Sequence, residues 1–464
     1  MEKIRIDFNN MTAESIGVKD GIPASAFSAY GKEIGAAHAQ VMENRGKGWQ
    51  EWTELPFADK DEIARIIAAG KEIKKSCESF VIFGIGGSAL GPLAVANALT
   101  HLRHNELKRS ARKAPRFYVE DNVDPERMAA LLDVINPEKT VFNIITKSGE
   151  TGETLSQMLI VLDILKKKLG NNAKDNIVVT TTIGKGALYD IAKAEGYRIF
   201  GLGKGVGGRF SVLSAVGLLP FAILGIDVKG LLKGAAAMSR ECFKKDFKAN
   251  PGLTAAFLQY YSMTRGKNIS VMMPYADSLK YMSDFYCQLW GESLGKSADN
   301  SGKLIYAGQT PVKALGVTDQ HSQIQLYTEG PFDKVITFIG VEKFRAEVAI
   351  PRVKGAEAVN FLQGHTLNEL LNAERQATEF AVTKAKRPNF TIIMPVVNAE
   401  TVGQLLMLMM YQTAFTGAML NIDAYNQPGV EEGKKATFAM LGRAGYEEKM
   451  KEIKAAFRSD KFVI

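Results

Sequence analysis

Residues 140–165 read TVFNIITKSGETGETLSQMLIVLDIL, and this stretch decides the fold class. Its first seven residues are mostly apolar and indicate a buried strand, whereas ETLSQMLIVLDIL has the apolar spacing of a helix. Between them lies a turn made of hydroxyl residues, glycines and one lysine. A strand that passes through a short turn into a helix is the repeating unit of a parallel sheet covered by helices.

The same alternation of strand-like and helix-like segments runs along most of the chain. The other strand-like runs are residues 80–86, 115–121, 175–182 and 197–203, followed by 267–276, 311–319, 334–343 and 390–398. This pattern predicts an α/β fold with two α/β/α sandwich domains whose sheets are mostly parallel. We expect residues 1–64 to form a mainly helical segment that packs on the second domain, 65–235 to form the first domain, and 236–464 to form the second domain with C-terminal helices. Because no low-complexity linker separates the halves, we expect a tight interface between them.

Composition narrows the function classes. The chain has 464 residues, 46% of them hydrophobic and 23% charged, which is typical of a globular protein. Its net charge of +8 suits a small anionic substrate and would also suit weak nucleic-acid contact. The most basic run, residues 103–113, is interpreted as a solvated helix face, so no nucleic-acid partner is expected.

Three features bear on the compartment. The three cysteines are far apart and odd in number, which favours a reducing compartment. The N-terminus has no pattern of a signal peptide. Residues 402–420 are almost long enough to span a bilayer, but Gln404 and Gln412 interrupt them, so a buried helix is expected. We therefore expect a cytoplasmic protein without a membrane partner.

The turn TKSGETGET, residues 146–154, is the first candidate site. It combines hydroxyls at Thr146, Ser148 and Thr151 with the cation of Lys147, and its glycines free backbone N–H groups. Ligands of open parallel sheets bind at the carboxyl ends of strands, where this turn lies. A phosphate monoester needs several convergent donors and positive charge, so the turn predicts a phosphate site. The alternative is a well-capped helix with a capping box that begins at Thr151.

The segment GIGGSALGP, residues 84–92, forms a second turn after a strand. Gly86 and Gly87 would let the backbone approach a ligand, and Ser88 has the position of a helix N-cap. Gly87 and Ser88 are therefore candidates for a sugar or phosphate contact, although a purely structural turn stays open. A dinucleotide site is also open, but its acidic residue is expected about 20 positions on. The nearest one in the next strand, Glu120, lies 31 positions beyond Ala89.

The segment GVGGRFSVLSAVGLLP, residues 205–220, places Arg209 after two glycines, and Ser211 could cap the helix that follows. A planar guanidinium is suited to stabilise a developing oxyanion. The alternative is a surface arginine paired with a carboxylate.

The segment SLKYMSDFYCQLWGESLGK, residues 278–296, reads as a helix on which Gln288 and Glu292 share a face. Glu292 lies near the helix end, where the dipole disfavours a carboxylate; this indicates a role as a base, but by position alone a structural role stays open. His321 follows a strand of the second sheet, which leaves catalytic, core and capping roles open. Lys434 lies in a helix that starts near Pro428, and by itself it is one lysine among many. No metal site is expected, because His101 and His104 lack a third ligand.

Taken in order, these segments and YNQPGVEEGKK (residues 425–435) resemble the bacterial type of phosphoglucose isomerase. The resemblance covers most of the chain. It implies two sugar-isomerase (SIS) domains, a homodimer with shared active sites, and no metal or organic cofactor. It also implies reversible conversion of glucose 6-phosphate to fructose 6-phosphate, a reaction of glycolysis and gluconeogenesis.

The resemblance also implies roles for individual residues. Glu292 would be the base that moves a proton between C2 and C1, and Arg209 would stabilise the intervening enediolate. His321 from the neighbouring subunit and Lys434 would open the sugar ring. The remaining substrate contacts would come from Ser88, Thr146, Lys147, Ser148 and Thr151 at the phosphate, and from Gln288 and Gln427 along the sugar. Glu150 would add repulsion near the phosphate unless its side chain points into solvent.

Two other functions are considered. One is a non-catalytic SIS-domain sensor of sugar phosphates, which would bind without turnover and tolerate changes at Glu292 and Lys434. The other is a nucleotide-dependent dehydrogenase that uses the glycine turn.

Overall fold

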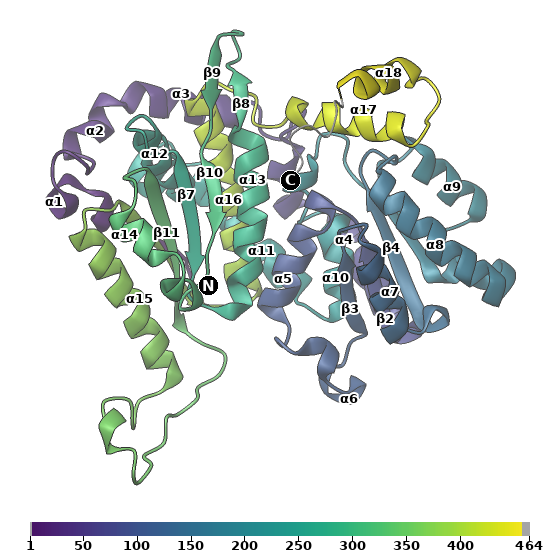
Figure 1. The fold of residues 1–464 in the computed structure, drawn as a ribbon, viewed down its shortest axis with the longest axis horizontal. Coiled ribbons are helices and arrows are strands. Elements are labelled where there is room, and N and C mark those ends of the chain that lie inside the picture. The colour runs from purple at the N-terminus through teal and green to yellow at the C-terminus, as the bar shows by residue number, and fades with distance from the viewer. Residues whose placement is uncertain (1, 457–464) are drawn as a thin grey trace.

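The first half of the chain forms a five-stranded parallel sheet in the computed structural model, which describes residues 2–456 (Figure 1). Its strand order is β3-β2-β4-β5-β6. The strands are β2 (Ser79–Phe83), β3 (Arg116–Glu120), β4 (Thr140–Thr146), β5 (Ile177–Thr181) and β6 (Arg198–Gly201). Because Phe83 pairs with both Glu120 and Ile144, the carboxyl ends of these strands meet at one edge.

Helices cover both faces of this sheet, as the alternation of its side chains requires. Val81 and Phe83 of β2 pack into one apolar cluster, whereas Phe80 and Ile82 pack into another. The first cluster includes residues of α7 (Pro125–Val134), α8 (Gly152–Leu169) and α9 (Ala187–Glu195). The second cluster includes residues of α4 (Lys60–Ser76), α5 (Leu90–Leu99) and α10 (Ala215–Leu224). The second cluster continues into the other half of the molecule, so the two halves share one core.

The second half contains another five-stranded sheet, with the order β1-β12-β11-β7-β10. The strands are β1 (Arg5–Asp7), β7 (Ile269–Pro274), β10 (Thr310–Lys313), β11 (Lys334–Lys343) and β12 (Asn389–Val396), and only β1 is antiparallel to its neighbour. One face packs on α12 (Pro251–Met263), α13 (Lys280–Leu294) and α16 (Ala399–Met419), the other on α14 (Ile324–Glu329) and α15 (Leu367–Lys384).

The apolar segment 402–420 lies almost entirely within α16, which is buried along its length. This confirms the expected buried helix. Within residues 2–456, no helix is long and apolar enough to cross a membrane.

The N-terminal segment reaches both halves. β1 pairs with β12, and α3 (Gly31–Glu43) packs against α16. The following loop meets the first half, where Gln50 forms an antiparallel bridge with Val206. The expected boundary at residues 235–236 lies inside α11 (Val228–Cys242), a helix that packs on α16. We therefore propose that the boundary between the halves lies at residues 225–227, between α10 and α11.

Three local expectations are wrong. Ser88 does not cap α5, because it lies in a 3-10 turn (Gly86–Ser88) that delays the helix start to Leu90. The hydroxyl of Ser211 donates to the carbonyl of Gly208 in a similar turn, and Ser214 caps α10 instead. Most of the basic run 103–113 is loop and 3-10 turn; its only helix, α6 (Arg109–Arg112), ends at Lys113, where φ is +55°.

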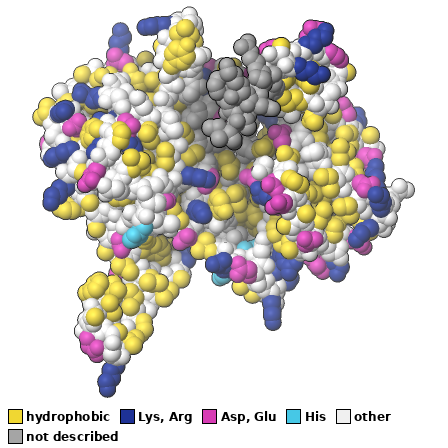
Figure 2. Space-filling model, in the orientation of Figure 1, with side chains coloured by type: hydrophobic (Ala, Val, Ile, Leu, Met, Phe, Trp, Pro, Cys, Tyr) yellow, Lys and Arg dark blue, Asp and Glu magenta, His cyan; other side chains and the backbone are white. Residues whose placement is uncertain are grey.

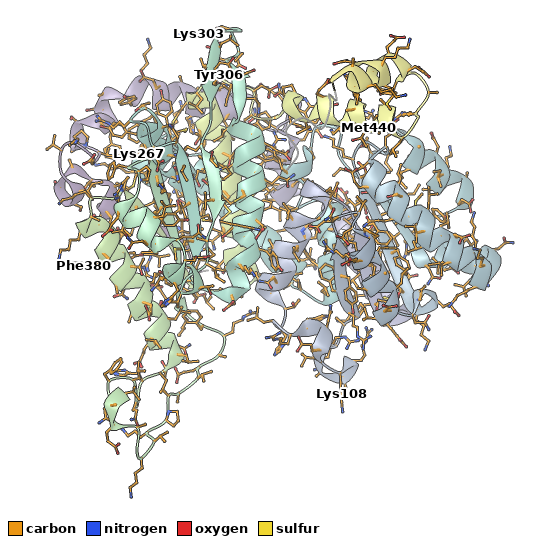
Figure 3. All side chains as sticks on the ribbon, in the orientation of Figure 1. Lys108, Lys267, Lys303, Tyr306, Phe380 and Met440 are labelled. Atoms are coloured by element: carbon orange, nitrogen blue, oxygen red, sulfur yellow. The ribbon has the colours of Figure 1, made fainter. Side chains whose placement is uncertain are left out.

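Three segments project from the body of the molecule (Figure 1). The hairpin of β8 (Lys296–Ala298) and β9 (Leu304–Ala307) carries Tyr306 near its tip (Figure 3). Residues 344–366, between β11 and α15, form a long arm. The helices α17 (Glu431–Met440) and α18 (Glu447–Ala456) lie over the first half, and Arg443 between them is 3.5 Å from Glu150.

Candidate active site

The turn between β4 and α8 brings three hydroxyls together. Oγ1 of Thr146 lies 2.6 Å from Oγ1 of Thr151. Oγ of Ser148 lies 3.3 Å from Oγ1 of Thr146 and 3.4 Å from Oγ1 of Thr151. Thr151 has the N-cap position of α8, but its side chain makes no capping bond, so the alternative of a capping box is wrong. We call residues 146–151 the phosphate turn and these three side chains the hydroxyl cluster.

Gly149 allows the phosphate turn to fold tightly. Its φ is +73°, and a Cβ at this position would lie 2.9 Å from the Cα of Gly186. A larger residue would therefore be strained and would push the turn away from the loop before α9. The neighbouring carboxylate of Glu150 is exposed and lies 3.5 Å from Arg443, so its charge is partly balanced outside the cluster.

Lys147 supplies the positive charge of the phosphate turn. Its Nζ donates to the carbonyl of Val206 at 2.6 Å and lies 4.0 Å from the ring centroid of Trp49. Burial lowers the pKa of Lys147 to about 8, while Glu51 opposes that shift. No carboxylate among residues 2–456 lies within ion-pair distance of this ammonium. A half-buried cation without a carboxylate partner suits an anionic ligand.

The glycine turn after β2 joins the two halves at the site. A Cβ at Gly87 would lie 2.1 Å from the carbonyl carbon of Gly208, and one at Gly86 would lie 2.6 Å from Nε2 of Gln288. Only glycine permits this approach to the arginine turn and to α13. The structural role of these glycines is therefore to bring the arginine turn and α13 together at the site.

Arg209 lies at the centre of the site and is only 4% exposed. The alternative of a surface arginine is therefore wrong. Its guanidinium donates to Oγ of Ser293 at 2.7 Å, the carbonyls of Ala424 and Asn426 at 2.7 and 3.2 Å, and Oε1 of Gln427 at 2.9 Å. Burial lowers the pKa of Arg209, whereas the nearby carboxylate of Glu292 raises it.

Glu292 lies near the end of α13 and is partly exposed. Its Oε2 lies 3.3 Å from Nη1 of Arg209, and its Oε1 accepts from Nε2 of Gln288 at 3.1 Å. The i, i+4 spacing of Gln288 and Glu292 therefore does place them on one face, as predicted. The carboxylate is held from both sides and still reaches solvent, as a base that must touch substrate requires.

Lys296 is buried at the end of α13, beside the backbone of Glu292, and sequence reasoning missed it. Its Nζ donates to the carbonyls of Glu292 and Ser293 at 2.7 and 2.9 Å, which satisfies the last turn of α13. Burial lowers the pKa of Lys296 to about 8. A lysine just after Gly295, at a predicted helix end, is the signal that could have found it.

Two predicted residues lie apart from this group within one chain. His321 lies in a 3-10 turn (Thr318–His321), where the neighbouring Gln320 accepts a hydrogen bond from Tyr275 at the end of β7. Among the described residues, Glu292 is bonded to Arg209 and Gln288, and neither Glu292 nor Arg209 forms a hydrogen bond or ion pair with His321. Lys434 is exposed on α17 and pairs with Glu431 at 2.8 Å.

This geometry agrees with the comparison against protein families. The model for phosphoglucose isomerase matches residues 60–458. The chain belongs to the phosphoglucose isomerase family.

Relatives and solved structures agree with this family. The chain is 51% identical to a glucose-6-phosphate isomerase of Carboxydothermus hydrogenoformans over 99% of both chains. It is 40% identical to that of Rubrobacter xylanophilus, over 96% of this chain and all of the other. A hypothetical protein of Thermus thermophilus has a TM-score of 0.86 at 35% identity, covering 95% of this chain and 100% of that one. A glucose-6-phosphate isomerase of Chlamydia trachomatis shares the fold, with a TM-score of 0.74 at 23% identity, 88% coverage of this chain and 81% of that one. The expected SIS-type α/β fold class is confirmed.

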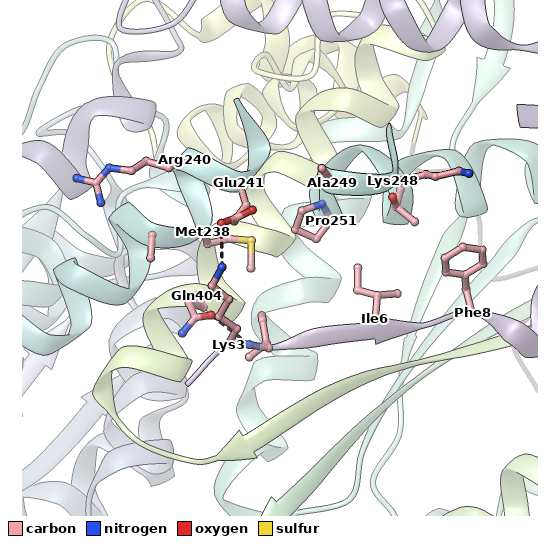
Figure 4. Close-up of a pocket in the computed structure, with 13 residues that line it drawn as sticks. Lys3, Ile6, Phe8, Met238, Arg240, Glu241, Lys248, Ala249, Pro251 and Gln404 are labelled. Atoms are coloured by element: carbon pink, nitrogen blue, oxygen red, sulfur yellow. Dashed lines mark hydrogen bonds and ion pairs between the residues drawn. The ribbon is translucent and has the colours of Figure 1, made fainter. Parts of the chain in front are cut away.

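The protein also contains a cavity of about 420 Å³, which Figure 4 shows in close-up. It is lined by β1, the end of α11 and the start of α12, with Ile6, Phe8 and Met238 on its walls. Lys3 and Glu241 form an ion pair of 3.3 Å across it. None of the candidate site residues lines it, so it carries no part of the chemistry described above.

Proposed function

We propose that the protein converts glucose 6-phosphate and fructose 6-phosphate into one another by aldose–ketose isomerisation. The observation that carries this proposal is the contact of 3.3 Å between the Glu292 carboxylate and the Arg209 guanidinium, beside the turns of the first sheet. A proton shuttle and a fixed cation in contact are the two groups that this reaction needs. The family to which the chain belongs supports the same activity.

In the proposed mechanism, Glu292 removes the proton from C2 of the open-chain aldose, and the electron pair moves toward O1. The cis-enediolate that forms carries its charge on the oxygens that face Arg209. Glu292 then returns the proton to C1, while the hydroxyl proton of O2 moves to O1, so no atom is gained or lost. Arg209 is held by Ser293 and two backbone carbonyls, so it needs no reorganisation when the charge develops.

The phosphate turn anchors the substrate away from the reacting carbons. The hydroxyl cluster, Lys147, Ser88 and the N–H groups near Gly87 would bind the phosphate, while Gln288 and Gln427 would line the sugar. Binding energy at the phosphate can then orient C1 and C2 against Glu292.

We further propose a cytoplasmic homodimer with shared sites, in which ring opening uses Lys434 and His321 of the second subunit. Two observations support it. His321 lies in its own 3-10 turn, and among the described residues it forms no hydrogen bond or ion pair with Glu292 or Arg209 of the same chain. The arm 344–366 exposes Val348, Val353, Val359 and Phe361, the last of them 74% exposed. Figure 2 shows that hydrophobic side chains cover much of this arm, at lower left. An exposed apolar arm suits a second copy of the chain.

The two other functions lack such support. Glu120 does end β3, but its Oε2 lies 2.6 Å from Nε of Arg127, so it is not free to bind a ribose. The space beside Gly86, the glycine that would let the backbone approach a pyrophosphate, is taken by the side chain of Gln288, whose Nε2 would lie 2.6 Å from a Cβ there. A sensor would not need the buried Arg209 to contact Glu292.

The shared site can be tested by mixing two inactive variants, Glu292→Gln and His321→Asn. A mixed dimer contains one site with both native residues, so random reassortment should restore about a quarter of the wild-type activity. The variants are unfolded or dissociated together, refolded and assayed by conversion of fructose 6-phosphate. If the mixture stays inactive although mixed dimers form, His321 does not act across the interface.

Loss of the Lys147 charge should lower the activity at alkaline pH. With its pKa lowered to about 8, Lys147 loses its charge above that pH, while a phosphate ester stays a dianion because its second pKa is about 6. We therefore expect kcat/KM for glucose 6-phosphate to fall as the pH rises through about 8 in the free enzyme. Lys147→Arg should remove this fall, since arginine keeps its charge. An unchanged fall in that variant would assign it to another group, such as Lys296.

A further inference from the structure

A loop of the N-terminal segment lies against the arginine turn. The backbone N–H of Gly205 donates to Oε2 of Glu51 at 3.0 Å, and Gln50 bridges to Val206. A Cβ at Gly205 would lie 1.8 Å from the carbonyl oxygen of Gly48, so the two backbones touch. Residues 48–51 are therefore fixed on segment 203–206 by several independent contacts.

Trp49 extends from this loop toward the phosphate turn. It is 50% exposed, whereas the other two tryptophans of the chain, Trp52 and Trp290, are fully buried. Nζ of Lys147 lies over the indole ring of Trp49, 4.0 Å from the ring centroid. Packing alone does not require an indole here, but the face of an indole attracts an ammonium group.

The ammonium of Lys147 is thus held by two neutral groups. One is the indole face of Trp49, and the other is the carbonyl of Val206 at 2.6 Å. Neither neutralises its charge, and an ammonium with three donors keeps two of them for another partner. The positive charge of Arg209 contributes to the lowered pKa of Lys147, so this ammonium lies on the side of the turn that faces the site.

We infer that Trp49 is a positioning residue for the phosphate group of the substrate and that it acts by holding the Lys147 ammonium at the hydroxyl cluster. This inference rests on the phosphate role proposed above for Lys147. Without the indole, the lysine side chain gains rotamer freedom and water, and phosphate binding weakens. The chemistry at C1 and C2 depends on Glu292 and Arg209 and should be unaffected.

The test compares Trp49→Leu, Trp49→Phe, Lys147→Met and the double variant Trp49→Leu/Lys147→Met. Binding of inorganic phosphate is measured by calorimetry, and KM and kcat are measured with glucose 6-phosphate. Trp49→Leu should weaken phosphate binding and raise KM by about fivefold to tenfold, with kcat within about twofold of wild type. Trp49→Phe should keep most of the affinity, because it keeps an aromatic face. The double variant should bind phosphate no more weakly than Lys147→Met alone.

The matched control is Phe380→Leu, which removes an aromatic ring that is 68% exposed on α15 at the outer edge of the second half (Figure 3). It should change neither KM nor phosphate binding. If Lys147→Met weakens phosphate binding but Trp49→Leu does not, the role of Trp49 is wrong and the phosphate site stands. The role of Trp49 is also wrong if the losses of phosphate binding in Trp49→Leu and Lys147→Met add up in the double variant. If Lys147→Met binds phosphate as wild type does, the proposed phosphate site fails as well.

Discussion

Glu292→Gln should bind glucose 6-phosphate normally and lose isomerisation by about 10²–10⁴-fold, the usual contribution of a general base. Glutamine keeps the size of the side chain and an oxygen that faces Arg209, so the site should stay assembled. It cannot accept the proton from C2. The exchange of that proton with solvent should therefore fall together with kcat, and both can be followed by NMR of the substrate in D2O.

The control is Glu329→Gln, which changes an exposed carboxylate at the end of α14. It should leave kcat and proton exchange unchanged. Full activity of Glu292→Gln, with folding and substrate binding intact, would remove Glu292 from the mechanism. A loss of binding equal to the loss of kcat/KM would instead make Glu292 a substrate-binding group.

Arg209→Lys should lower kcat by about 10²–10³-fold while KM changes little, as expected for a group that stabilises charge in the transition state. An ammonium keeps the charge but cannot reproduce the planar set of donors to Ser293, Ala424 and Gln427. Each buried acceptor left without a partner costs about 1–3 kcal/mol, so the melting temperature should fall as well.

Activity of Arg209→Lys is therefore normalised to the folded fraction, measured by circular dichroism at the assay temperature. The matched control is Arg198→Lys, because Arg198 forms an exposed ion pair with Glu72 at 2.8 Å and should matter little for stability. If folded Arg209→Lys retains wild-type kcat, the guanidinium does not stabilise the enediolate.

Local sequence patterns predicted most of the fold because strands and turns are short-range features. The run 140–146 coincides with β4, and the run 334–343 coincides with β11. The predicted caps at Ser88 and Ser211 were wrong because 3-10 turns precede α5 and α10, and such turns shift a helix start by a few residues. The pairing of β1 with β12 joins segments that lie far apart in the sequence, and no local pattern indicates it.

In the candidate site too, features that depend on neighbouring residues could be predicted from the sequence, whereas contacts between distant segments could not. The polar turn at Thr146–Thr151, the glycines before Arg209 and the spacing of Gln288 and Glu292 could all be read locally. The contact of Trp49 with Lys147 and the fit of Gly87 on Gly208 depend on approaches between distant segments. The roles of His321 and Lys434 come from the family resemblance, and they stay predictions because neither side chain forms a hydrogen bond or ion pair with Glu292 within one chain.

The most direct test is a crystal structure with 5-phosphoarabinonate, whose carboxylate mimics the enediolate. The phosphate should lie within hydrogen-bond distance of the hydroxyl cluster and Lys147, and the carboxylate end should contact Arg209 and Glu292. If the phosphate binds at the hydroxyl cluster while the carboxylate of Glu292 stays out of reach of the ligand in every subunit, the proposed mechanism is wrong.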